Sequence, residues 1–169
     1  MHLDDFNRAD PADAADIAMV WAAIPSWVDA IVAARPYGTV EDVARAAERA
    51  AEEWDANDLD AALAHHPRIG QRPVGLGAEA AASRREQAAM AGAPAELARE
   101  MARVNAAYEE RFGRVFLIRA AGRSPEEMLA EARRRLANDK DSEASEAVGQ
   151  LRQIALLRLR RSLSDDLAA

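Results

Sequence analysis

The chain has 169 residues, half of them hydrophobic and 30% charged, with a net charge of −7 and no cysteine. This length predicts a single domain over residues 1–169 with enough apolar surface for a core. The acidic balance argues against nucleic-acid binding, the lack of cysteine excludes disulfides and thiolate chemistry, and three histidines are too few to suggest a zinc site, so no metal is expected.

The same composition argues against a membrane partner. No stretch approaches the roughly 18 consecutive apolar residues that a spanning helix needs. The first ten residues, MHLDDFNRAD, lack the basic start and apolar run of a secretion signal. We therefore expect a cytoplasmic protein. The arginines at 133–135 are surrounded by acidic residues, and we interpret that run as a solvated helix face.

Helices are predicted along most of the chain, because alanine is abundant and the breaks between apolar-periodic segments are short. Pro11 and Pro94 can open helices, and Thr39 is a favourable N-cap with acidic residues in the next turn. Gly113 stops a helix, and residues 124–127, SPEE, form a capping box. The helices expected, in chain order, span residues 11–23, 26–34, 39–54, 57–65, 78–90, 94–112, 125–137 and 141–163.

Two segments depart from this pattern. Residues 66–77, HPRIGQRPVGLG, carry two prolines and three glycines, so regular structure is not expected there. Residues 115–118, VFLI, are the only strand candidate, and an extended connector is the alternative. The predicted fold class is all-α, a compact irregular bundle of seven or eight helices with little or no sheet.

Chemistry is suggested first by His66, which follows a predicted helix and precedes Pro67. The proline pushes the backbone of His66 out of the helical region, so the imidazole can project from a helix end. An imidazole exchanges protons near neutral pH, which suits a general acid or base. The alternative is that His66 only terminates the helix and satisfies local carbonyl groups. His65 would point elsewhere and is interpreted as exposed.

A second candidate group lies on the alanine-rich helix predicted at 78–90. Ser83, Glu86 and Gln87 have the spacing i, i+3 and i+4, which places their side chains on one helix face. Such donors and acceptors on an otherwise small, apolar helix suit the orientation of a polar heterocycle. A polar surface stripe is the alternative interpretation.

The third candidate is Arg158 on the last predicted helix. At about 100° per residue, Arg158 falls near the middle of an apolar stripe, whereas Arg160 points almost the opposite way. A buried guanidinium needs an anion or several acceptors. The partner could be an internal carboxylate such as Glu86 or Glu109, or the carboxylate or ureido oxygens of a ligand. The stripe consists of Ala144, Ala147, Val148, Leu151, Ile154 and Ala155.

Taken in order, these segments resemble the OHCU decarboxylase family, where OHCU is 2-oxo-4-hydroxy-4-carboxy-5-ureidoimidazoline. The resemblance extends from about residue 6 to residue 163. It is specific because several short motifs recur in the same order and spacing. These are PSWV at 25–28, RPY at 35–37, HPRIG at 66–70, SxxEQ at 83–87, NxxYExRFG at 105–113 and LRL at 157–159.

The resemblance implies an all-α homodimer that decarboxylates OHCU to (S)-allantoin in urate degradation, without a cofactor. It makes His66 the catalytic acid/base and Glu86 its carboxylate partner. The same resemblance makes Pro67, Ser83, Gln87 and Arg158 substrate-binding residues. His65 stands where a small residue is more usual, so the catalytic histidine is identified by the proline that follows it.

Two other functions remain open on the sequence. One is a related helical enzyme that acts on another ureide or cyclic amide, since residues 72–77 could change the choice of substrate. The other is a non-catalytic helical binding module, in which the HPRIG segment is only a surface feature. Binding of nucleic acid ranks last, because aromatic residues make up only 5% of the chain.

Overall fold

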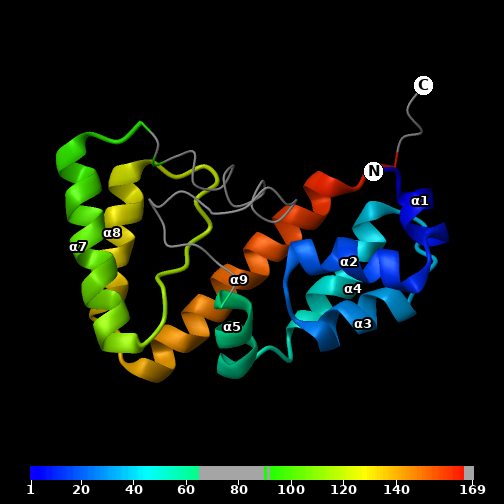
Figure 1. Ribbon diagram of the computed structural model, residues 1–169, viewed down its shortest axis with the longest axis horizontal. Helices are drawn as coiled ribbons and strands as arrows, with labels where there is room; N and C mark the ends of the chain where they lie inside the picture. Colours follow the sequence, from blue (N-terminus) through cyan, green and yellow to red (C-terminus); the bar gives the residue numbers. More distant parts are fainter. Residues whose placement is uncertain (65–89, 91, 166–169) are drawn as a thin grey trace. The chain divides into compact units, whose positions relative to one another are not determined.

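Eight α-helices and no β-strand occur among residues 1–64, 90 and 92–165, which are the residues that this computed structural model describes (Figure 1). The predicted all-α class is therefore confirmed. The helix predicted at 78–90 lies almost entirely outside the described residues. The helices are α1 (Leu3–Arg8), α2 (Pro11–Trp21), α3 (Pro25–Ala33), α4 (Val40–Ala51), α5 (Ala56–Leu63), α7 (Ala95–Phe112), α8 (Pro125–Leu136) and α9 (Lys140–Ser162).

Two helix starts follow the predicted capping chemistry, those of α4 and α8. The Thr39 hydroxyl accepts a hydrogen bond from the Asp42 N–H, and Ser124 and Glu127 form the reciprocal bonds of a capping box. Gly113, at φ 72°, ends α7 in the left-handed conformation that glycine adopts without strain. These local signals set the boundaries of α4, α7 and α8 to within a few residues of the prediction.

Three predictions need correction or refinement. Helix α1 was not predicted; its N-cap is the imidazole of His2, which accepts from the Asp4 N–H. Helix α5 is capped by Asp55 rather than by Asn57 or Asp58, because the Asp55 carboxylate accepts from both of those backbone N–H groups. Residues 115–118 form no strand and belong to an irregular connector, the second of the two alternatives.

The described chain divides into two compact units. The first comprises Met1–Trp54 together with the chain from Arg152 onward, so it holds α1 to α4 and the end of α9. Its core contains two aromatic pairs: Phe6 packs against Trp21 and Trp27 against Trp54, each with ring centroids 5.4 Å apart. Single-domain organisation over residues 1–169 stays a prediction.

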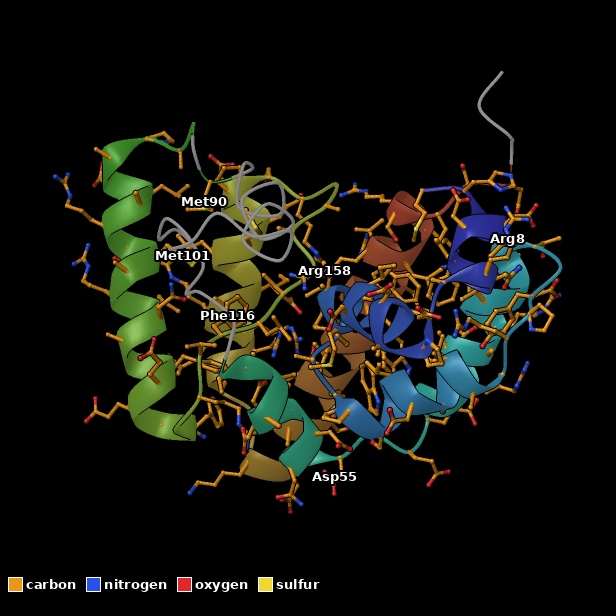
Figure 2. All side chains as sticks on the ribbon, turned by 45° about the vertical axis from the view of Figure 1, so that its right-hand side comes forward. Arg8, Asp55, Met90, Met101, Phe116 and Arg158 are labelled. Atoms are coloured by element: carbon orange, nitrogen blue, oxygen red, sulfur yellow. The ribbon has the colours of Figure 1, made fainter. Side chains whose placement is uncertain are left out.

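The second unit spans Asp55–Leu151 and contains α5, α7, α8 and the first half of α9. Helices α7 and α8 pack side by side and run in the same direction, so residues 113–124 must return along the pair before α8 begins (Figure 1). Tyr108 and Phe116 lie in the core of this unit with Met101 and Met128, and the side chains of Met101 and Phe116 are labelled in Figure 2. The returning segment is therefore part of the core, not a surface loop.

No helix among the described residues is both long and apolar enough to cross a membrane. The three arginines at 133–135 do not share one environment. Arg133 and Arg134 have side chains that are 56% and 50% exposed, in agreement with a solvated face, but Arg135 is fully buried. The interpretation of the run as solvated is therefore wrong for Arg135, and the reason is its helical position three residues after the buried Ala132.

Candidate functional site

Arg158 is the one predicted site residue whose surroundings the structure describes. The other predicted site residues lie outside the described part of the chain. These are His66, Pro67, Ser83, Glu86 and Gln87.

Arg158 is buried on α9, as the apolar stripe predicts (Figure 2). Its exposed fraction is 6%, and Ala147, Leu151 and Ile154 on the same helix are exposed by 2% or less. Arg160 is exposed and pairs with Glu41, with its Nη2 3.1 Å from the Glu41 Oε1. Helical geometry therefore identifies correctly which of the C-terminal arginines faces the interior.

The Arg158 guanidinium reaches the end of another helix. Its Nη1 donates a hydrogen bond to the backbone carbonyl of Val20, in the last turn of α2, at 3.1 Å. Carbonyl groups in the last turn of a helix lack intrahelical partners and carry partial negative charge, so a guanidinium is a favourable neighbour. The contact therefore gives Arg158 a structural role in its own unit.

A pocket of about 370 Å³ lies within the second unit, where α5 and α7 both end. Leu63 and Ala64 line it from the end of α5, and Gly113, Arg114 and Val115 line it from the start of the connector. The volume falls in the range of small-molecule pockets. Two residues beyond Ala64, the chain reaches His66.

The polar lining of this pocket comes from Asp60, Glu109 and Arg114. Arg114 and Asp60 form a two-point ion pair: Nε lies 3.0 Å from Oδ1, and Nη2 donates to Oδ2 at 3.1 Å. The ends of two helices contribute partial negative charge. Asp60 matches the Arg114 charge and Glu109 adds a second carboxylate, so the lining favours a molecular group that carries N–H donors over an anionic group.

A buried polar cluster lies in the same unit, around Glu143 on α9. Its carboxylate accepts from the Tyr108 hydroxyl, from Nε of Arg135 at 3.0 Å and from Nδ2 of Asn138 at 2.8 Å. The side chains of Arg135 and Glu143 are exposed by only 0% and 1%. Burial, and next the hydrogen bond to Glu143, raise the pKa of Tyr108 above its ordinary value, so the phenol stays protonated as a donor.

This cluster extends to the connector between α7 and α8. Nη1 of Arg135 donates to the backbone carbonyl of Leu117 at 2.6 Å, and the guanidinium carbon lies 4.8 Å from the centroid of the Phe116 ring. The backbone N–H of Arg119 donates to Oε1 of Gln150 on α9 at 2.9 Å. Side chains therefore satisfy backbone groups that a β-ladder would satisfy in a sheet.

Arg135, Glu143 and Gln150 were not predicted as buried polar residues, although a signal was available. Arg135 follows Met128 and Ala132 at helical spacings of seven and three, and Glu143 and Gln150 precede Ala147 and Ile154 by four. Helical periodicity, which identified Arg158, places these three side chains on buried faces in the same way. Among residues 1–64, 90 and 92–165, no group of three or more His, Asp or Glu side chains is placed to hold a metal ion.

Comparison with known proteins assigns the chain to a family. The sequence model of the OHCU decarboxylase family matches residues 7–160. A 2-oxo-4-hydroxy-4-carboxy-5-ureidoimidazoline decarboxylase from Haloferax volcanii is 24% identical over 165 residues, which cover 97% of each chain. The enzyme of the same name from Amia calva is 38% identical over 96 residues, covering 56% of this chain and 55% of that protein, so this match spans about half of its length.

Two solved structures share the fold. A crystal structure of OHCU decarboxylase in the presence of (S)-allantoin has a TM-score of 0.74 and 24% identity, over 87% of this chain and 96% of that one. A crystal structure of (S)-allantoin synthase has a TM-score of 0.69 and 16% identity, over 96% of this chain and 54% of that one. Because the family model covers nearly the whole sequence, the chain belongs to the OHCU decarboxylase family.

Proposed function

We propose that this chain catalyses the decarboxylation of OHCU to (S)-allantoin, in the degradation of urate. The observation that carries the proposal is the match of the family model over residues 7–160. Arg158 is the one proposed site residue among those that the structure describes, and its burial supports the proposal further. The pocket at the end of α5 has a volume that suits a small heterocycle, and its acidic lining suits N–H donors such as those of the ureido group; the substrate carboxylate is not assigned to this pocket.

The substrate carries its own electron sink, so the reaction as proposed needs no cofactor. Its carboxylate is attached to a ring carbon next to a C=N bond. When the carbon–carboxylate bond breaks and CO2 leaves, the electron pair forms a ring C=C bond, and the C=N electrons move to the ring nitrogen, which takes a proton. The resulting enol then gains a proton on carbon and loses its hydroxyl proton, which gives the carbonyl group of allantoin.

We assign the proton transfers to His66, with Glu86 as the carboxylate that orients its imidazole and stabilises the charged form. Ser83, Gln87 and Arg158 would hold the ureido, ring and carboxylate oxygens, with Pro67 against the ring. Delivery of the proton to one face of the enol would make the product a single enantiomer. Groups mounted on helices suit this task, because small displacements of reacting groups reduce rates strongly.

The assignment of His66 is tested by His66→Ala and His66→Gln. We expect both variants to fold normally and to lose about a hundredfold or more in kcat, the usual contribution of a general acid or base. The substrate is generated freshly from urate with the two preceding activities, and its loss and the optical activity of the product are followed. His65→Ala is the matched control and should retain the wild-type rate. A folded His66→Ala variant with near-normal turnover would contradict the assignment.

We propose in addition that the protein is a homodimer, as the family resemblance implies, and that it is cytoplasmic, as the sequence led us to expect. Light scattering on the purified full-length chain measures the mass directly, and the monomer mass is 18.3 kDa. A mass of about twice that value is expected for the dimer, by simple addition of two identical chains. A monomer at the concentrations of the activity assay would overturn this part of the proposal.

A further inference from the structure

Two side chains of the second unit bind the backbone of the connector between α7 and α8. Arg135 on α8 donates to the carbonyl of Leu117 at 2.6 Å, and Gln150 on α9 accepts from the N–H of Arg119 at 2.9 Å. These bonded backbone groups are two residues apart. Helices α8 and α9 therefore hold the connector at two points within residues 117–119.

The Arg135 side chain is itself fixed in place. Nε and Nη2 both donate to Oε1 of Glu143, whose carboxylate also accepts from Tyr108 and from Asn138. The ion pair is buried, with the Arg135 and Glu143 side chains exposed by 1% or less. Replacement of such a buried ion pair by apolar residues is often neutral or stabilising, so stability alone does not account for its presence. Hydrogen bonds between polar groups in an apolar core depend on orientation, whereas apolar contacts do not. Here they fix the position of one backbone carbonyl.

The connector held in this way forms one wall of the pocket at the end of α5. Val115 lines the pocket, and the next residue, Phe116, packs under the Arg135 guanidinium. The lining also includes Leu63 and Ala64, after which the chain continues to His66. A shift of the connector would therefore change the shape of a pocket that adjoins the proposed catalytic segment in the sequence.

We propose that Arg135 and Gln150 are positioning residues for the decarboxylation, acting through the backbone of residues 115–119. The inference rests on the proposed function and adds to it two residues outside the proposed His66, Glu86 and Arg158 machinery. A displacement of about 1 Å in a group that contacts substrate can reduce turnover by about a hundredfold. Loosening the connector should therefore lower kcat even when the chain remains folded.

Gln150 provides the first test, because its single backbone contact can be removed without leaving a charge unpaired. Gln150→Leu keeps the size of the side chain but cannot accept from the Arg119 N–H. Gln150→Glu keeps an acceptor oxygen and should therefore restore the wild-type kcat. We expect Gln150→Leu to lower kcat by roughly tenfold or more with KM changed by less than about threefold, and to speed hydrogen exchange of the Arg119 amide.

Arg135 provides the second test. Arg135→Met alone would strand the Glu143 carboxylate and could unfold the unit, so the informative variant is Arg135→Met with Glu143→Leu, which replaces the pair by apolar side chains. We expect this double variant to fold and to show the same selective loss of kcat. Arg133→Met, at the exposed neighbour whose side chain is 56% exposed, is the matched control and should keep the wild-type kcat.

The possible outcomes distinguish failure of the proposed function from failure of the positioning role of Arg135 and Gln150. Wild-type protein that does not accelerate the loss of fresh substrate overturns the proposed function and this inference with it. Active wild type with unchanged kcat and KM per folded molecule in Gln150→Leu overturns the inference alone. A fall in kcat that Gln150→Glu restores, with the melting temperature nearly unchanged, supports positioning, since a purely structural role would lower the melting temperature first.

Discussion

Arg158 illustrates how one side chain can contribute to both folding and binding. Its guanidinium is buried against the last turn of α2, where the carbonyl of Val20 accepts one N–H. Hydrogen bonds from charged donors contribute about 1.5–3 kcal/mol, more than neutral ones. The same planar group is the natural partner of a substrate carboxylate. Substitution at this position should therefore change stability and affinity together, and the two effects can be measured separately.

We predict that Arg158→Ala lowers the free energy of unfolding by about 2 kcal/mol, because the Val20 carbonyl loses its partner and a buried side chain leaves a cavity. The same variant should raise KM for OHCU by about tenfold or more, as the loss of a charged hydrogen bond implies. Urea denaturation and steady-state kinetics measure the two effects. The exposed Arg161→Ala is the control and should change unfolding by less than about 0.5 kcal/mol. A destabilised variant with unchanged KM would show that Arg158 is purely structural.

At the level of single residues, helical periodicity could predict which side chains are buried but not what they contact. The stripe on α9 identified Arg158 correctly, whereas the contact with Val20 joins residues 138 positions apart, which no local pattern encodes. Arg135 was missed for a different reason. Three consecutive arginines resemble a surface run, and only the position of each one relative to Ala132 and Met128 separates the buried residue from its neighbours.

Among the helices, α8 shows how local chemistry determines where an element begins. Ser124 accepts from the Glu127 N–H at 3.1 Å, and the Glu127 carboxylate accepts from the Ser124 N–H at 2.7 Å. Pro125 follows at the first helical position, where its missing N–H has no consequence. The start of α8 also fixes where the connector must end, so the cap contributes to the register of α8 against α7.

We predict that Ser124→Ala lowers the free energy of unfolding by about 1 kcal/mol, within the range of about 0.5–2 kcal/mol for loss of an N-cap. Ser124→Thr should retain most of the stability, because its hydroxyl can accept the same bond. Ser145→Ala, at an exposed interior position of α9, is the control and should be neutral or slightly stabilising, since alanine favours helix. Equal effects at 124 and 145 in thermal or urea unfolding would argue against the capping box as the cause.

Helices were predictable where the chain carries its own start and stop signals. Thr39, Ser124 and Gly113 act within one turn of their own position, so α4, α7 and α8 begin or end close to where the sequence indicates. Helix α1 was missed because its cap is an imidazole, which is not among the usual capping residues. The connector could not be assigned from the sequence, since the side chains that hold it come from α8 and α9, 18 and 31 residues away.

On the scale of the whole molecule, this acidic chain pairs carboxylates with arginines in both units. Glu41 pairs with Arg160 in the first unit, and Glu100 pairs with Arg133 in the second. In each case the hydrogen bond from the arginine is the main cause that lowers the pKa of the carboxylate. Such exposed pairs are individually weak, so their importance lies in their number and in their common dependence on pH.

We predict that stability falls as the pH drops below about 4.5, the ordinary value for glutamate. Because folding lowers the pKa of these carboxylates, the unfolded chain binds protons at a higher pH than the folded chain does, so unfolding takes up protons and becomes easier in acid. Urea midpoints at about pH 7, 5, 4 and 3 measure this, and they should be nearly constant between the first two and then decline. Glu100→Gln removes one of the contributing carboxylates and should flatten the decline slightly, whereas Glu110→Gln, at an exposed site in the same helix, should not. A midpoint that rises between pH 5 and 3 would contradict this prediction, because the chain is close to its isoelectric point of about 5.0 at the start of that interval and gains net positive charge below it, so relief of charge repulsion cannot account for such a rise.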